Sequence, residues 1–559
     1  MKNLFRSNVL MMLLLLLTAC VRSSHFTPSA VPSATTTIIA TPTVTPIPSQ
    51  TATATIEPTP KPVYVPPTLI PTIDPTLVPD LLRNAFSIQT LEGINGHNMQ
   101  QITGWDRGFG GGRWADYCDG YYWLDTNHLL LYPTTGQVGP REGYETPVNA
   151  AWQPVVINLE SGILWLPPVN TSSTQACKRV YWSRELGTLI TSENRDNIST
   201  VSTYTYDGYK LASYPGSLLD VSPSGSKILV TDDTLIDLRT NKKIELNWNL
   251  EDYWEIFWTS DETRIYRCCY FYADLTSGIS QRFEVTDLQD TSGNHVRSSV
   301  LSFRNGFWVR DDTYFLVWWL AVDDGDVKYL PMFDPATKTF YDVREMAGIP
   351  EDFTSKYTPV SPDGNYVWME GWNGSYLVNL ATFESQYFSY ANISYTDIDW
   401  SPASKFVWFQ VYDSVNESTE FQIFSIADKK LSPLPVVPLP ESERLWHPND
   451  NTVVYPAKDK NALIFLDAST MSFRELPFKN QEKPYKISNL TWSPNGEKLA
   501  CITENGNLWQ VDYPKLENLE QLTLSLPDVG DVNWSPDGNS IAFVSGPDIY
   551  IVETPNNLQ

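Results

Sequence analysis

The sequence is poor in cysteine, histidine and basic residues. Its 559 residues include 6 cysteines, 5 histidines and 39 lysines plus arginines, against 65 acidic residues, and the formal net charge is −26. No basic stripe is available to neutralise phosphates, so a nucleic-acid partner is not expected. Without a Cys-x-x-Cys pair or histidines spaced four apart, neither a metal nor another cofactor is expected. A Gly-x-Ser-x-Gly nucleophile elbow is also missing, which argues against a serine hydrolase domain.

The sequence also has no apolar run long enough to cross a bilayer. Lys2 and Arg6 precede a short apolar run at Val9–Leu17, and Thr-Ala-Cys20 comes next. A basic start, an apolar core and small residues are typical of an export signal, which we assign to residues 1–19. The sequence Leu-Thr-Ala-Cys resembles a bacterial lipobox, whose cysteine is acylated and becomes the mature N-terminus. The resemblance implies a lipid attached at Cys20 on the outer face of the bacterial cell membrane. The alternative is an ordinary signal peptide whose cleavage site contains a cysteine.

Residues 20–80 contain very few charged or aromatic side chains. The segment is mostly Thr, Pro, Ser and Ala, with charges at Arg22, Glu57, Lys61, Asp74 and Asp80. Such a composition cannot build a core, so we predict a disordered, polyproline-like linker. At ~3 Å per residue, a linker of this length reaches on the order of 180 Å when fully extended. It serves either as a stalk across a cell-wall layer or as a tether without defined reach, and it offers threonines for O-linked sugars.

The repeated sequence Trp-Ser-Pro-Asp-Gly is the most informative feature that is present. Its clearest copies are Trp492–Gly496, with Asn in place of Asp, and Trp534–Gly538; related copies begin at Val221, Val360 and Trp400. Serine, proline and glycine in this order favour a type I turn. Because apolar stretches flank the turn, the motif predicts a tight hairpin between two buried strands.

A second hairpin follows the first in each repeat. It consists of a strand, an Asp or Asn, a polar turn and another strand, as in Phe465–Phe473 and Phe333–Phe340. Four strands in each repeat correspond to one blade of a β-propeller. Weaker copies of the first motif begin at five further tryptophans, and the repeats are spaced at about 40–50 residues. These tryptophans are Trp123, Trp182, Trp258, Trp308 and Trp446.

The sequence therefore predicts an all-β fold, a β-propeller of four-stranded blades over residues 81–559, with up to ten units. Ten blades exceed the usual range of about four to eight, so one large ring, two smaller rings and incomplete weak units are all consistent with the spacing. In the last repeat only three strands can be placed, one that ends at Trp534 and two more that end near Val552. We predict that Ala85–Leu91 supplies the missing outer strand, which would close the ring by joining the two ends of the chain.

These repeats resemble those of TolB-type and WD-repeat-like propellers, and those of the propeller part of dipeptidyl-peptidase-type enzymes. The resemblance covers roughly residues 85–559 and depends on the repeated motif alone. It implies blade turns without catalytic residues. Because the sequence ends shortly after the last repeat, no hydrolase domain is expected.

Two cysteines occupy equivalent positions in neighbouring repeats. Cys118 and Cys177 each lie five residues before the tryptophan of their repeat, so a disulfide between them is one prediction and free buried thiols are the other. We predict that Cys501 belongs to the core. We also expect His447, which takes the serine position of the motif, to be structural.

Candidate ligand-binding residues lie in loops away from the repeated turns. In propellers similar to this one, ligands usually bind at the mouth of the ring opposite the repeated turns. We expect two of the candidate loop segments to lie at that mouth. The aromatic residues of three glycine-bearing loops are candidates for stacking on a sugar or peptide, with core packing as the alternative. The mouth candidates are Arg141, Glu142, Tyr144, Asp323, Asp324 and Asp326, and the stacking candidates are Trp105, Trp114 and Trp372.

The leading functional prediction is a lipid-anchored, extracytoplasmic β-propeller that binds protein, peptide or glycan without catalysis. A rigid ring with variable loops suits recognition, although a fold alone does not define a function. One alternative is a carbohydrate- or peptide-active enzyme with two or more carboxyl groups of raised pKa in the central funnel. Another is a TolB-like component of envelope assembly.

Overall fold

The computed structural model describes most of the chain after Phe86, which belongs to one compact unit, Tyr64–Gln559. Within this part, one short helix occurs, α3 (Val343–Met346), and no helix has the length and apolar character needed to span a bilayer. The described residues are 87–93, 97–103, 120–132, 154–169, 180–195, 198–248, 256–267, 271–282, 289–290, 306–317, 330–350, 353, 358–371, 374–389, 393–413, 418–439, 442–458, 461–478, 487–524, 526–527, 529–546 and 548–554.

The described strands form ten sheets, in which all pairings but one are antiparallel, and we number them as blades 1 to 10. Blade 1 contains β3 (Gly120–Trp123), β4 (His128–Tyr132), β5 (Val155–Asn158) and β6 (Leu164–Trp165). Blade 2 contains β7 (Val180–Ser183), β8 (Thr188–Arg195), β9 (Ile198–Thr205) and β10 (Lys210–Pro215). Blade 3 contains β11 (Leu218–Val221), β12 (Lys227–Val230), β13 (Thr234–Asp237) and β14 (Lys242–Glu245). Blade 4 contains β15 (Ile256–Trp258), β16 (Arg264–Arg267), β17 (Phe271–Asp274) and β18 (Ile279–Arg282).

Blade 5 has a fifth strand, and blade 6 shows three strands. Blade 5 contains β20 (Gly306–Val309), β21 (Tyr314–Val317), β22 (Pro331–Asp334) and β23 (Thr339–Asp342), and β19 (Gln289–Asp290) pairs with β23 in parallel. Blade 6 contains β24 (Tyr366–Glu370), β25 (Gly374–Asn379) and β26 (Ser385–Ser389). An isolated bridge between Val360 and Val367 takes the place of its first strand.

The remaining blades complete the series. Blade 7 contains β27 (Ile393–Trp400), β28 (Phe406–Asp413), β29 (Ser418–Ser425) and β30 (Lys430–Pro433). Blade 8 contains β31 (Leu445–Trp446), β32 (Thr452–Pro456), β33 (Ala462–Asp467) and β34 (Ser472–Pro477). Blade 9 contains β35 (Ile487–Trp492), β36 (Lys498–Thr503), β37 (Leu508–Asp512) and β38 (Glu520–Gln521). Blade 10 contains β39 (Val529–Trp534), β40 (Ser540–Ser545) and β41 (Asp548–Glu553), joined by β2 (Asn98–Thr103) and β1 (Ser87–Glu92).

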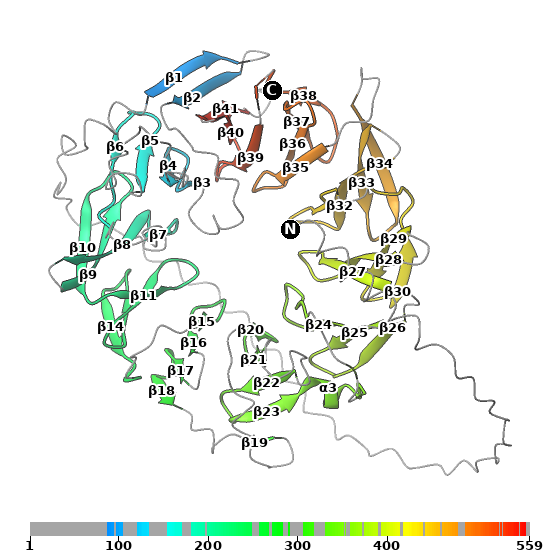
Figure 1. Cartoon of the computed structure of the whole chain (residues 1–559). Coiled ribbons are helices and arrows are strands. Elements are labelled where there is room, and N and C mark those ends of the chain that lie inside the picture. Colours follow the sequence, from blue (N-terminus) through cyan, green and yellow to red (C-terminus); the bar gives the residue numbers. More distant parts are fainter. Residues whose placement is uncertain are drawn as a thin grey trace, which may run out of the picture. The chain divides into compact units, whose positions relative to one another are not determined.

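The sheets form a single propeller ring, so the prediction of an all-β propeller is confirmed and the two-ring alternative is wrong. In Figure 1 the first strand of a blade, such as β7 or β39, lies nearest the centre, and the last strand lies at the rim. Each of the weak tryptophan copies ends or contributes to the first strand of a described sheet, so these repeats are blades as well.

Neighbouring blades pack through shared apolar clusters, which continue around the ring. Leu129 of blade 1 lies in one cluster with Ile551 of blade 10, and Leu499 of blade 9 lies in one with Phe465 of blade 8. Phe257 of blade 4 contacts the Phe315 ring of blade 5 with centroids 5.0 Å apart. Because each sheet buries both of its faces in this way, the core is distributed between the blades.

The N-terminal segment closes the ring, but not with the strand predicted from the sequence. Met99 of β2 pairs with Val552 of β41, so β2 is the fourth strand of blade 10. The predicted segment, described from Ser87, forms β1 and pairs with β2 as an added fifth strand. The prediction that the N-terminal segment closes the ring is therefore confirmed. The predicted strand is wrong, because β2 and not β1 pairs with β41.

The repeated residues have the structural roles that their chemistry indicates. In the Ser-Pro-Asp-Gly turn of blade 10, the Ser535 Oγ accepts a hydrogen bond from the Ser540 backbone N–H at 2.9 Å, and Gly538 has a φ of 71°. In the second hairpin, Asp467 or its equivalent accepts hydrogen bonds from the following turn. Cys501 is buried, and burial raises the pKa of its thiol to about 12, as expected for a core residue.

Candidate functional site

The ligand-binding residues predicted from the sequence lie outside the described residues. The predicted lipid-attachment residue Cys20 also lies outside this range, as do Cys118 and Cys177 of the predicted disulfide. These assignments therefore stay predictions. The predicted ligand-binding residues that lie outside the described residues are Trp105, Trp114, Arg141, Glu142, Tyr144, Asp323, Asp324, Asp326 and Trp372.

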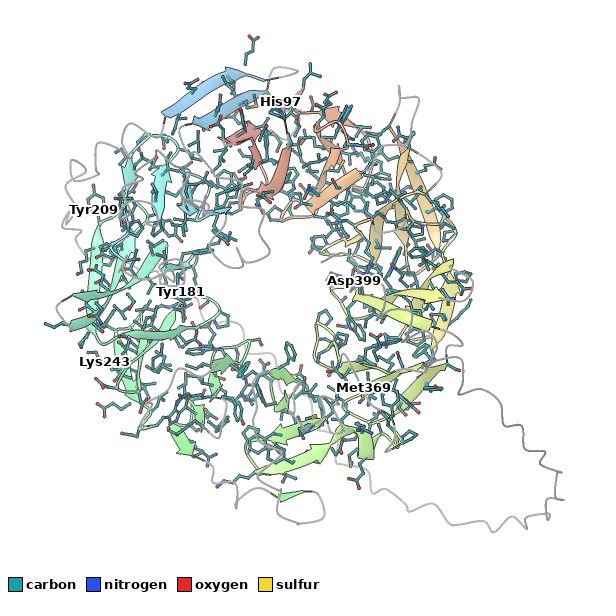
Figure 2. All side chains as sticks on the ribbon, in the orientation of Figure 1. His97, Tyr181, Tyr209, Lys243, Met369 and Asp399 are labelled. Carbon is teal, nitrogen blue, oxygen red and sulfur yellow. The ribbon has the colours of Figure 1, made fainter. Side chains whose placement is uncertain are left out.

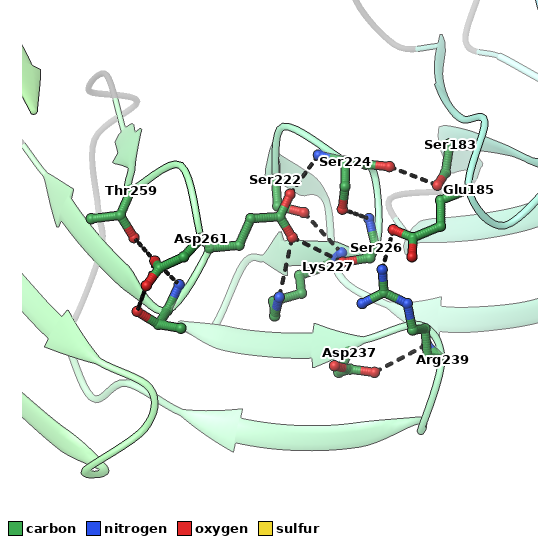
Figure 3. Close-up of polar contacts among 12 residues, drawn as sticks. Ser183, Glu185, Ser222, Ser224, Ser226, Lys227, Asp237, Arg239, Thr259 and Asp261 are labelled. Atoms are coloured by element: carbon green, nitrogen blue, oxygen red, sulfur yellow. Dashed lines mark hydrogen bonds and ion pairs between the residues drawn. The ribbon is translucent and has the colours of Figure 1, made fainter. Parts of the chain in front are cut away.

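The hairpin turns of neighbouring blades are linked by hydrogen bonds into what we call the turn face of the ring. In Figure 3, the Ser183 Oγ of blade 2 donates to the Ser224 carbonyl oxygen of blade 3 at 2.7 Å. The Glu262 carboxylate of blade 4 accepts from the Ser224 backbone N–H at 2.5 Å and from the Ser226 Oγ at 2.9 Å. Lys227 lies 3.1 Å from the same carboxylate. These contacts fix three consecutive blades relative to one another.

The same type of link occurs at other junctions on the turn face. The Ser260 backbone N–H of blade 4 donates to Asp312 of blade 5 at 2.6 Å. The Asp363 backbone N–H of blade 6 donates to the Ser404 Oγ of blade 7 at 3.0 Å. His447 of blade 8 is buried, and its Nε2 lies 2.9 Å from the Gly496 carbonyl oxygen of blade 9, which supports the structural role expected for it.

Glu262 occupies the position at which the repeated motif has glycine. The sequence predictions did not include this residue. Its φ of 54° is close to that of the motif glycines, such as Gly225 at 72°. Burial alone would raise the pKa of this carboxyl group, but the hydrogen bonds from Ser224, Ser226 and Lys227 lower it to about 2. A carboxylate that is so strongly bound by its own protein is structural.

The first strands of the blades form the inner wall of the ring, where Figure 2 labels Tyr181 of β7 and Asp399 of β27. On β11, Asp220 accepts a hydrogen bond from the Trp258 Nε1 at 2.8 Å. Burial raises the pKa of Asp220 to about 6, although the bond from Trp258 opposes the shift. Burial and the neighbouring Asp220 also raise the pKa of Tyr181. The inner wall thus contains a carboxyl group whose pKa is raised to about 6.

Two pockets of ligand size open between blades. One, of about 380 Å³, lies between blades 5 and 6 and is mainly apolar, with Phe307 and Pro359 in its lining. The other, of about 320 Å³, lies between blades 8 and 9 on the turn face, and we call it the blade 8/9 groove. Its lining is mainly polar and includes Asp450, Asn451, Asp467, Phe473, Arg474 and Tyr513.

A histidine between two carboxylates joins blades 1 and 2. The His128 Nδ1 lies 2.9 Å from Asp125, and its Nε2 lies 3.0 Å from Asp207. Burial lowers the pKa of His128, but the two carboxylates outweigh this effect and raise it. Within the described residues, no group of three or more His, Cys, Asp or Glu side chains could hold a metal ion.

Comparison with known proteins does not narrow the function. No protein-family model matches the chain, and no curated protein sequence matches it significantly. The likeness to TolB-type repeats consequently stands on the repeated motif alone. What the described residues define is a β-propeller, a fold that serves generally as an interaction scaffold.

Proposed function

We propose that this protein is a lipid-anchored, extracytoplasmic β-propeller of TolB-like type that binds a protein, peptide or glycan without transforming it. The observation that carries the proposal is the rigid, interlocked ring. Hydrogen bonds join the turns of neighbouring blades, and apolar clusters fill the spaces between the sheets. A scaffold held this firmly loses little conformational freedom on binding, which favours recognition.

The entry point of the chain supports tethering. Because β1 is the outermost strand of blade 10, the chain enters the ring at its rim. A tether attached at the rim leaves both mouths of the ring accessible. This arrangement is consistent with the linker proposed for residues 20–80 and with lipid attachment at Cys20.

The proposal leaves catalysis out for a chemical reason. The enzyme alternative calls for two or more carboxyl groups of raised pKa in the funnel, so that one can act as an acid and another as a base or nucleophile. On the described inner wall, Asp220 supplies one such group. Because Asp220 is buried and accepts a hydrogen bond from Trp258, we assign it a structural role.

Two measurements test the proposal. Expression in a bacterial host with radiolabelled palmitate should label the wild-type chain, whereas Cys20→Ser should remain unlabelled. The full-length chain, immobilised in detergent, should retain specific molecules from cell-wall glycans and envelope extracts, and the same chain after heat unfolding should not. Failure to incorporate palmitate would remove the lipid anchor, and failure to retain any molecule would refute the binding function.

A further inference from the structure

The blade 8/9 groove differs from its counterpart in the same ring. Repeat by repeat, its lining corresponds to a pocket of about 60 Å³ between blades 6 and 7. There Lys429 and Glu384 form an ion pair across the junction, with Nζ and Oε1 2.5 Å apart. The equivalent positions between blades 8 and 9 are Leu516 and Ser472, which cannot form such a pair. The groove of about 320 Å³ is therefore several times larger than the equivalent pocket between blades 6 and 7.

The wall of the groove is held in place by hydrogen bonds and ring contacts. The Tyr513 OH donates to Asp450 at 2.7 Å and lies 2.8 Å from the Thr452 Oγ1. The Tyr513 ring stacks on Phe465 with an interplanar angle of 19°. The Arg474 guanidinium lies over Tyr513, 5.6 Å from the ring centroid, and donates to the Pro514 carbonyl oxygen. Side chains fixed in this way form a preorganised surface.

Polar groups and an exposed aromatic ring face the same space. The Phe473 side chain lines the groove and is 40% exposed. Asn451 also lines it, and its side-chain amide has no hydrogen-bond partner among the described residues. Asp450 retains 41% side-chain exposure and can accept a further hydrogen bond. The groove thus presents donors, acceptors and an apolar ring face together.

We propose that the blade 8/9 groove binds one ring of a neutral sugar, as a subsite for a glycan. Sugar hydroxyl groups donate and accept hydrogen bonds, as Asn451, Asp450 and Arg474 require, and the C–H face of a sugar can pack on Phe473. Two carboxylates against one guanidinium disfavour an anionic ligand. The volume lies near the lower end of the range for ligand pockets, about 300–1,000 Å³. This inference rests on the proposed binding function and selects its glycan alternative.

The test measures binding of three neutral disaccharides, cellobiose, maltose and N,N′-diacetylchitobiose, to the full-length chain in detergent by calorimetry. At least one should bind saturably. Phe473→Ala should weaken this binding about tenfold or more by removing the stacking face. The double variant Ser472→Glu with Leu516→Lys, which rebuilds the ion pair of blades 6 and 7, should abolish it. Tyr387→Ala is the matched control, because it removes an exposed aromatic ring from β26 of blade 6, outside the groove, and should change nothing.

The outcomes separate this inference from the broader proposal. Melting temperatures close to wild type in Phe473→Ala and in the double variant would show that lost binding is not caused by unfolding. Unchanged affinity in both would overturn the groove as the site. If none of the disaccharides binds while envelope proteins or peptides are still retained, the sugar inference fails and the binding scaffold stands. If nothing at all is retained, both fail.

Discussion

Replacing Glu262 tests whether side-chain contacts between turns stabilise the ring. Glu262 occupies a glycine position at a φ of 54°, which costs a non-glycine residue about 1 kcal/mol. The decrease of its pKa from 4.5 to about 2 corresponds to about 3 kcal/mol of stabilisation, at roughly 1.4 kcal/mol per pH unit. Glu262→Gly removes both effects, so we expect the free energy of unfolding to fall by about 2 kcal/mol. Glu262→Ala keeps the backbone cost and should lose about 3 kcal/mol.

The pH dependence gives the sharper readout. The pKa of Glu262 is lower in the folded than in the unfolded chain. Its contribution is therefore fully present above about pH 4.5 and is lost as the pH falls through about 2. Around pH 3 the remaining contribution of the carboxylate is close to the backbone cost of about 1 kcal/mol that glycine avoids. The stability difference between the wild type and Glu262→Gly should therefore shrink to near zero at that pH.

Urea unfolding followed by tryptophan fluorescence at pH 7, 4.5 and 3 provides the measurement. Hydrogen exchange of the Ser224 backbone amide, which donates to Glu262, reports on the same link locally. The control is Glu185→Ala, which removes an exposed ion pair to Arg239 and should change stability by less than about 1 kcal/mol. A Glu262→Gly variant as stable as wild type at pH 7 would refute the reasoning.

Three further predictions concern other described residues. Gly225→Ala should lower the melting temperature by several degrees, because the added Cβ would lie 2.6 Å from Ser183. Gly278 has a similar φ but open space around the added Cβ, so Gly278→Ala should lower the free energy of unfolding by only about 1 kcal/mol. Calorimetric scans of both variants measure the difference. Asp220→Asn should stabilise the ring above about pH 6 and have little effect below about pH 4, because the carboxyl group ionises more easily in the unfolded chain. Unfolding curves between pH 4 and 7 measure this change in the effect of the substitution. His128→Gln should remove stability that is present at acidic pH and is lost as the pH rises through the raised folded pKa, and an unchanged stability profile between pH 5 and 8 would contradict this.

The architecture could be predicted because its signals are local and repeated. The turn Trp534–Gly538 and its relatives determine where two strands meet, irrespective of the rest of the chain. The number of rings could not be predicted from spacing alone, since the angle between neighbouring blades depends on packing between sheets. That packing occurs between residues such as Phe465 and Leu499, which belong to different repeats.

The closing strand was assigned incorrectly for a related reason. The apolar residues in Ala85–Leu91 indicate one strand, whereas the structure has the hairpin β1–β2. Asn95-Gly96, a dipeptide that favours hairpin turns, was the available signal for two strands. Which of the two pairs with β41 depends on contacts across more than 400 residues of sequence, and no local pattern encodes them.

The features of the blade 8/9 groove were beyond the reach of sequence reasoning as well. Asp450 and Tyr513 approach each other only because the last hairpin of blade 9 packs beside the first turn of blade 8. The larger size of the groove is evident only against the equivalent pocket, where Lys429 and Glu384 form an ion pair. Glu262 could have been noticed as a substitution at a repeated glycine, although its three partners come from the neighbouring blade.

The closing sheet also constrains the order of folding. Blade 10 joins β2, near the start of the described chain, to β41, near its end. During synthesis the early hairpin must wait for almost the whole polypeptide before its final partner is available. Contacts this distant in sequence are slow to form because a long loop has to close first. Until then, the unpaired edge of β2 is open to other chains, and assistance from a chaperone would have its greatest effect during that interval.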